Sequence, residues 1–144
     1  MVAEVVVRER LTAVIAETTT WQAFPALWGR LLEEVWQAVR GDETVQPGRN
    51  VMLYKDDVPN VEIGVEAAAP FAAIGRVVSS TLPAGRVVTA THRGPFGEVG
   101  ATHEAVIQAC AERGLRRLGP RWEIYGHWDE RDPKPEVQVY YLVA

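Results

Sequence analysis

Apolar and polar residues follow a pattern along this chain that predicts two similar halves. In the first half, an apolar run over residues 5–18 is typical of a strand. Pro25 then marks the start of a helix, which Gly41 ends. Two short alternating segments, residues 51–54 and 61–65, follow and predict a hairpin. Apolar residues recur along the helix at four-residue steps, opposite a charged face: Leu27, Leu31, Val35 and Val39.

The second half repeats this order of elements. Residues 86–92 alternate as a strand does, a helical stripe runs from Val99 to Cys110, and segments 122–125 and 137–142 predict a second hairpin. Each of these residues in the first half is separated from its counterpart in the second by the same number of positions: Phe24 and Phe96, Leu27 and Val99, and Val35 and Ile107. We therefore expect two strand–helix–strand–strand units, about 1–70 and 85–144. Residues 71–84 would link them, with a strand at 74–80 and a turn at 82–85.

Two such units predict an α+β fold built on one long antiparallel sheet with a pseudo-twofold axis. Both helices should cover one face, and the other should form a concave ligand groove between the halves. Side-chain alternation assigns Trp122 and Ile124 to the face under the second helix. The opposite, groove-facing set would then contain Glu123, Tyr125 and, by the repeat, Met52 and Tyr54.

Composition narrows the class of protein. The chain has 144 residues, which fits a single domain over residues 1–144. Its net charge of −4 argues against a broad nucleic-acid surface. The first half is the more acidic one, which indicates either two differently solvated halves or a field that attracts cationic ligands. We find no apolar run long enough to span a bilayer and no basic signal segment. One cysteine, Cys110, fits a reducing compartment, so we expect a cytoplasmic protein.

Several common chemistries have no counterpart in the sequence. The three histidines lack zinc-ligand spacing, the acidic turn at 129–132 does not match a calcium loop, and Ser79 lies outside any nucleophile elbow. The glycines form no phosphate loop. We therefore expect neither a metal nor a cofactor. His92 should bond the turn that follows its strand, and His103 should be a core residue of the second helix.

Three motifs together resemble the GyrI-like small-molecule-binding family, which includes gyrase-inhibitory proteins and the effector-binding domains of multidrug-sensing transcription activators. They are the Leu-Pro-Ala-Gly segment at 82–85, the His-Arg-Gly-Pro-Phe segment at 92–96 and Glu-Ile-Tyr at 123–125. The resemblance covers essentially the whole chain. It implies a groove for bulky aromatic, often cationic, compounds, with a buried glutamate on the penultimate strand at the position of Glu123. The activators carry a helix-turn-helix that is absent here, so we expect no direct DNA binding.

Each candidate ligand contact also has a purely structural interpretation. Glu123 could be a surface glutamate on an edge strand, or it could pair with Arg121 or Arg86. Trp36 and Trp122 fit the core, whereas Trp21 precedes the first helix and is a candidate for stacking on a ligand. The remaining candidates for the ligand site are Trp28, Phe96 and Tyr141, with Tyr140 assigned to the core.

Three functional hypotheses remain. The first is a binding module that sequesters or senses hydrophobic, preferably cationic, aromatic molecules, with Glu123 as the charge partner. The second is a cofactor-free hydrolase of cyclopropane-bearing DNA-alkylating compounds that uses Glu123 and Tyr125, since the resemblance extends to free-standing members implicated in that reaction. The third is gyrase inhibition by protein–protein contact. The sequence leaves the ligand's identity and a homodimer through a sheet edge open.

Overall fold

The computed structural model describes residues 1–126 and 136–144. His127 and the acidic turn at 129–132 lie outside the described residues, so the interpretations of these positions remain predictions.

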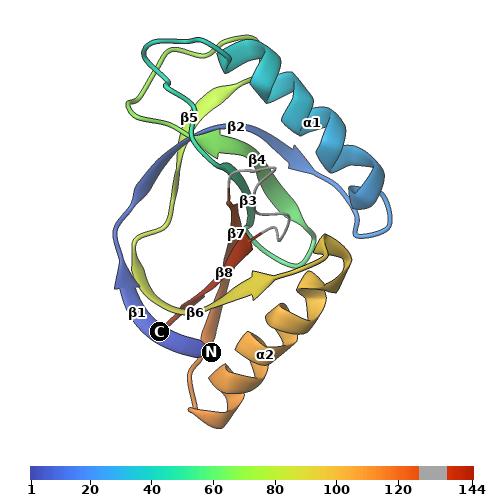
Figure 1. Ribbon diagram of the computed structural model, residues 1–144, viewed down its shortest axis with the longest axis vertical. Coiled ribbons are helices and arrows are strands. Elements are labelled where there is room, and N and C mark those ends of the chain that lie inside the picture. The colour runs from blue at the N-terminus through green and yellow to red at the C-terminus, as the bar shows by residue number, and fades with distance from the viewer. Residues whose placement is uncertain (127–135) are drawn as a thin grey trace.

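The described residues form an eight-stranded antiparallel sheet and two α-helices, as the predicted α+β class requires (Figure 1). The strand order in the sheet is β1-β6-β8-β7-β3-β4-β2-β5. The elements along the chain are β1 (Val2–Val7), β2 (Arg10–Thr18), α1 (Phe24–Val39), β3 (Asn50–Tyr54), β4 (Asn60–Glu66), β5 (Val78–Leu82), β6 (Gly85–Arg93), the single turn η1 (Phe96–Glu98), α2 (Val99–Glu112), β7 (Arg117–Tyr125) and β8 (Glu136–Val143). Within the described residues, neither helix combines the length and apolarity needed to cross a bilayer.

The predicted repeat is present in the sheet. The units β2-α1-β3-β4 and β6-α2-β7-β8 meet at the β3–β7 pair, and the strand order reads outward from that pair in the same way on both sides. Met52 lies opposite Glu123 and Leu53 opposite Trp122 in this central register. Residues close to the pseudo-twofold axis therefore come from both halves.

The segments that precede the two units differ from the prediction. The run expected as one strand over 5–18 is divided into β1 and β2, and the linker strand occupies 78–82 rather than 74–80. The residues at 82–85 do not reverse the chain. Val7 faces Gly85 and Arg10 faces Leu82, so the register of the β1–β6 pair continues into the β2–β5 pair. The two long segments thus form one bent antiparallel ribbon that links the outer edges of both halves and closes the sheet into a ring (Figure 1).

Closure of the sheet determines which face the helices cover. Helix α1 packs mainly on β4 and β2, and α2 packs mainly on β6 and β8. A third apolar cluster contains no helical residue: Val14, Val51, Leu53, Leu82, Val87, Trp122 and Ile124. These residues come from strands all around the ring and line its inner face. The two helices lie outside the ring (Figure 1).

The predicted face assignment is therefore wrong. Trp122 and Ile124 do not pack under α2, and the third cluster lines the concave face that was expected to be the ligand groove. Met52, Tyr54, Glu123 and Tyr125 do share one face, as predicted, but it is the helix-bearing face. The physical reason is that a sheet curled on itself covers its own inner apolar side chains and needs no helix there.

Candidate functional site

The central strands β3 and β7 lie between the regions that the two helices cover. On their helix-bearing face, Tyr125 packs against the apolar clusters of both helices, which makes it a junction between the two halves. Glu123 precedes it by two residues and therefore points to the same face. Apolar cores of both halves thus surround a carboxylate close to the pseudo-twofold axis.

Glu123 is only 3% exposed, and three side chains hold its carboxylate. The hydroxyls of Tyr54 and Tyr125 each donate to Oε1 at 3.0 Å, and Nε2 of His103 lies 2.8 Å from Oε2. Within the described part of the chain, no lysine or arginine forms an ion pair with this carboxylate. Its hydrogen bonds are therefore satisfied by two hydroxyls and an imidazole and not by a fixed cation.

This geometry excludes the structural alternatives raised by the sequence. β7 is a central strand, so Glu123 does not lie on a sheet edge. Arg121 pairs with Asp57 at 2.8 Å, and Arg86 pairs with Glu4 at 2.7 Å. Neither arginine neutralises Glu123.

The two tyrosines are hydrogen-bond donors at any moderate pH. Burial, followed by the charge of the Glu123 carboxylate, raises the pKa of both the Tyr54 and the Tyr125 hydroxyl well above the usual range. Each hydroxyl consequently keeps its proton and directs it at Oε1.

His103 is the residue that sequence reasoning missed. It was expected to be a core residue, but it connects Glu123 with Tyr141, whose hydroxyl lies 2.7 Å from Nδ1. Burial raises the pKa of Tyr141 to about 12, so this hydroxyl keeps its proton and can donate it to Nδ1. Nε2 then carries the hydrogen that faces Glu123. The signal in the sequence was a polar residue within the apolar stripe of α2.

His92 behaves as predicted. Its Nε2 lies 2.9 Å from the carbonyl oxygen of Pro95, and its Nδ1 lies 3.1 Å from the Thr102 hydroxyl. It therefore ties the end of β6 to the start of α2 and does not take part in the Glu123 cluster.

Aromatic rings flank the carboxylate on both sides. The ring centroids of Phe24 and Tyr54 are 5.5 Å apart, and those of Phe96 and Tyr125 are 5.6 Å apart, so each half contributes an equivalent phenylalanine–tyrosine pair. Trp21 lies 5.6 Å from Tyr54 and donates its indole N–H to the carbonyl of Asp57 at 3.0 Å. Both Trp21 and Phe96 are exposed. Solvent-accessible rings therefore lie at both ends of the cluster.

Arg121 already places a cation against two of these rings. The carbon at the centre of its guanidinium lies 5.5 Å from the Trp21 ring and 5.9 Å from the Tyr54 ring. The same guanidinium forms an ion pair with the exposed Asp57. The aromatic faces at this end of the site are therefore occupied by an internal cation.

Most of the predicted site residues do come together. Glu123, Tyr125, Tyr54 and Met52 form the centre, with the Tyr54 hydroxyl 3.6 Å from the Met52 sulfur. The flanking positions belong to Trp21, Phe96 and Tyr141. Trp28 is 38% exposed on α1 and makes no ring contact with the group among the described residues. Tyr140 points to the inner face and stacks on Trp122 with centroids 5.5 Å apart, and Trp36 donates to Asn50 beneath α1.

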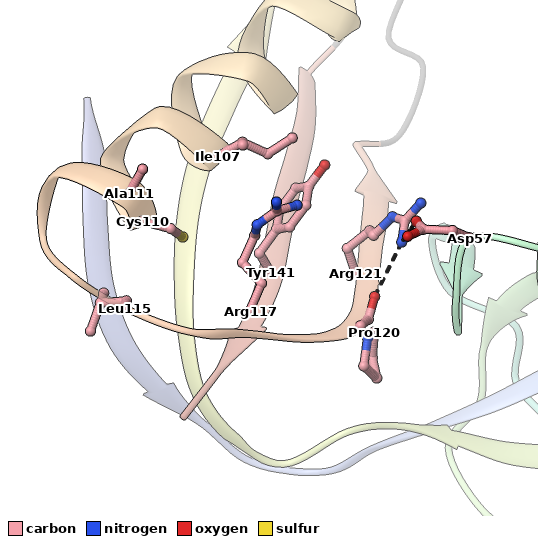
Figure 2. Close-up of a pocket in the computed structure, with 10 residues that line it drawn as sticks. Asp57, Ile107, Cys110, Ala111, Leu115, Arg117, Pro120, Arg121 and Tyr141 are labelled. Carbon is pink, nitrogen blue, oxygen red and sulfur yellow. Dashed lines mark hydrogen bonds and ion pairs between the residues drawn. The ribbon is translucent and has the colours of Figure 1, made fainter.

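Two of the cavities that described residues line lie near this group. One, of about 430 Å³, lies between α2 and the start of β7 and includes Tyr141 and Arg121 in its lining (Figure 2). The other, of about 340 Å³, opens on the inner face of the ring beside Trp122 and Tyr140. Among residues 1–126 and 136–144, no group of histidine, cysteine and acidic side chains is arranged to hold a metal ion.

Comparisons with known proteins agree with this architecture. A family model described as the GyrI-like small molecule binding domain matches residues 2–144. No functionally curated protein matches the sequence. The C-terminal domain of EcmrR superposes with a TM-score of 0.77 at 19% identity, covering 100% of this chain and 97% of that one.

Two further structures share the fold. SAV2435 bound to tetraphenylphosphonium has a TM-score of 0.71 at 15% identity and covers 100% of this chain and 94% of its own. A protein from Listeria innocua described as a hydrolase has a TM-score of 0.60 at 17% identity. The superposition covers 99% of this chain and 91% of the Listeria innocua chain. At these identities the three structures establish the shared fold alone.

Proposed function

Because the chain belongs to the GyrI-like small-molecule-binding family, we propose that it binds bulky aromatic cations beside the carboxylate of Glu123. The observation that carries this proposal is the buried carboxylate without a lysine or arginine partner among the described residues. A buried charge is costly unless it is paired, and a ligand cation would provide the missing partner. A neutral ligand of the same shape would not.

The flanking rings support an aromatic ligand. Trp21 and Phe96 are exposed, and each lies against a tyrosine whose hydroxyl bonds Glu123. A planar or multi-ring cation would gain stacking and cation–π energy of about 1–2 kcal/mol per desolvated ring. The SAV2435 structure contains tetraphenylphosphonium, a ligand of this chemical type, which makes that cation the natural first probe. Binding would serve sequestration or sensing of such compounds.

Calorimetric titration of the whole chain tests the proposal. Tetraphenylphosphonium is compared with triphenylphosphine oxide, a neutral molecule with similar rings. Glu123→Gln should weaken binding of the cation about tenfold or more and change the dissociation constant of the neutral ligand by less than about twofold. Glu62→Gln is the matched control, because Glu62 is also buried but is paired with Lys55 and Ser80. An equal loss for both ligands in Glu123→Gln would refute charge pairing.

One observation favours a second candidate, a cofactor-free hydrolase. The Glu123 carboxylate contacts an imidazole and a tyrosine hydroxyl directly. Carboxylates and imidazoles are general acids and bases, and a protonated tyrosine hydroxyl orients a water or substrate oxygen by donating a hydrogen bond. In the candidate reaction, water forms a C–O bond to a cyclopropane carbon. The strained C–C bond breaks, its electron pair moves into the conjugated carbonyl, and the water proton returns to that system.

Mass spectrometry distinguishes this candidate from binding. A cyclopropane-bearing alkylator is incubated with far less than one equivalent of protein. A product heavier by one water, formed beyond one equivalent and lost in the Glu123→Gln/Tyr125→Phe double variant, supports hydrolysis. Turnover that survives both substitutions excludes this role for the pair. Gyrase inhibition stays a prediction, and a pull-down with gyrase subunits tests it.

A further inference from the structure

The cavity of about 430 Å³ between α2 and the start of β7 has two chemically different walls (Figure 2). One wall is apolar and comes mainly from α2: Ile107, Cys110, Ala111 and Leu115. The other is polar and contains Arg117 and Arg121 from β7 together with Tyr141 from β8. Asp57 lies at the far side. Such a combination suits a molecule with an apolar body and a charged end.

The charge of the polar wall is positive. Two guanidinium groups lie on it, and the carboxylate of Asp57 lies at the far side of the cavity. Arg121 uses one nitrogen for Asp57 at 2.8 Å and for the Gly119 carbonyl at 3.3 Å. The Asp57 side chain is 92% exposed, so water screens its interaction with Arg121. Arg117 forms no ion pair with an acidic side chain within residues 1–126 and 136–144.

Arginine charges act to lower the pKa of two titratable groups that line the cavity. Burial raises the pKa of Tyr141, but the charges of Arg121 and Arg117 act against that rise. Burial likewise raises the pKa of the Cys110 thiol, and Arg117 opposes it. In both groups the arginine charge favours the anionic form, while burial, the larger effect, disfavours it.

We propose that this cavity is an anion-accepting subsite that takes the carboxylate, sulfonate or phosphate of an amphipathic small molecule. The planar guanidinium groups of Arg117 and Arg121 bind the acidic oxygens, and the apolar body of the molecule packs on Ile107, Ala111 and Leu115. Two arginines against one exposed carboxylate leave one positive charge for one anionic group.

The subsite adjoins the Glu123 cluster. The ring of Tyr141 lines the cavity, while its hydroxyl bonds His103, which bonds Glu123. The inference rests on the proposed function only in placing the aromatic part of the same ligand near Glu123. A ligand that spans both places carries a cationic aromatic part beside Glu123 and an acidic group at the two arginines, and is therefore a zwitterion.

Fluorescence titration with 8-anilinonaphthalene-1-sulfonate tests the subsite, with N-phenyl-1-naphthylamine as the probe of similar shape without the sulfonate. Arg117→Gln and Arg121→Gln should each weaken binding of the sulfonate about tenfold. Each should change the dissociation constant of the neutral probe by less than about twofold. Arg30→Gln removes the same charge from an exposed position on α1, so it should change the binding of neither probe. Among the described residues, the Arg30 side chain bonds only the Ala26 carbonyl. Equal losses in Arg30→Gln and the two cavity variants would overturn the proposal.

Two further measurements show where the sulfonate binds and whether the anion subsite stands without the proposed function. In amide NMR spectra, the sulfonate should shift Ala111, Leu115 and Gly119 and leave Leu82, which lines the inner-face cavity, unchanged. Shifts confined to Leu82 and its neighbours would contradict the assignment. If tetraphenylphosphonium binding proves independent of Glu123 while the sulfonate still depends on both arginines, the proposed function fails and the anion subsite stands. If tetraphenylphosphonium binding depends on Glu123 while the sulfonate binds independently of both arginines, the anion subsite is refuted and the proposed function stands.

Discussion

Tyr54 and Tyr125 occupy equivalent positions in the two halves of the chain, and both donate a hydrogen bond of 3.0 Å to the same oxygen of Glu123. The repeat thus supplies two donors but only one acceptor, because the counterpart of Glu123 in the first half is Met52, directly opposite in the sheet. A symmetric framework therefore holds a single negative charge close to its axis.

Removing either donor should destabilise the fold by a similar amount. Tyr54→Phe and Tyr125→Phe each leave the buried carboxylate with one hydrogen bond fewer, which costs about 1–2 kcal/mol. Urea denaturation measures the free energy of unfolding. Tyr140→Phe is the control, since its hydroxyl donates to Gln138 on the other face of the sheet. Two tyrosine variants at the site that are as stable as the control would contradict the role of the hydrogen bonds.

The tyrosines should resist ionisation in the folded protein. The chain has four, and burial is the leading cause of the raised pKa of every one, with Tyr141 at about 12. A raised folded pKa contributes stability that is complete below the unfolded value of about 10 and is lost as pH rises through about 12. Phenolate absorbance at 295 nm should therefore stay low at pH 10 and appear together with unfolding.

The same titration in concentrated guanidinium chloride provides the reference. There the four side chains should ionise near pH 10. A folded-state curve that coincides with this reference would show that the rings are open to solvent.

Arg121→Gln should tighten the binding of aromatic cations while it weakens that of aromatic anions. The guanidinium occupies the faces of Trp21 and Tyr54, and its charge opposes a second cation there. Its removal should lower the dissociation constant of tetraphenylphosphonium about threefold to tenfold, measured by calorimetry. Weaker binding of the cation in this variant would mean that Arg121 supports the aromatic site and does not compete with the ligand.

Two glycines should respond to alanine in opposite ways. A Cβ on Gly64 would lie 1.9 Å from the carbonyl oxygen of Ala13 on the paired strand β2, so Gly64→Ala must separate β4 from β2. We expect a loss of about 3 kcal/mol or more. Gly29 lies in the middle of α1, and a Cβ added there would meet no atom within 4 Å outside the neighbouring helix backbone. Gly29→Ala should therefore stabilise the protein by about 0.5–1 kcal/mol. Thermal unfolding compares both variants, and a neutral Gly64→Ala would exclude the close strand approach.

Local patterns in the sequence predicted most of the elements and the relation between Glu123, Tyr125, Met52 and Tyr54. Alternation along a strand establishes which residues share a face, and the equal spacing of the two halves transfers that grouping from one to the other. The pattern does not say which face a helix covers, and the assignment of Trp122 and Ile124 failed for that reason. His103 was missed because the position of a residue on a helix does not identify the strand residue beneath it.

The sequence by itself determined the two strand–helix–strand–strand units, the motifs of the family and the shared face of the candidate site, because these depend on periodicity and turn chemistry between neighbouring residues. Tertiary structure alone decided that β1 pairs with β6 and β5 with β2 in one continuous ribbon. That long-range pairing curls the sheet, lines its inner face with an apolar cluster from its own strands and leaves the outer face for the helices and Glu123. It also brings His103 and Tyr54 to one carboxylate, since contacts between residues distant in the chain follow from how the elements pack and not from their order.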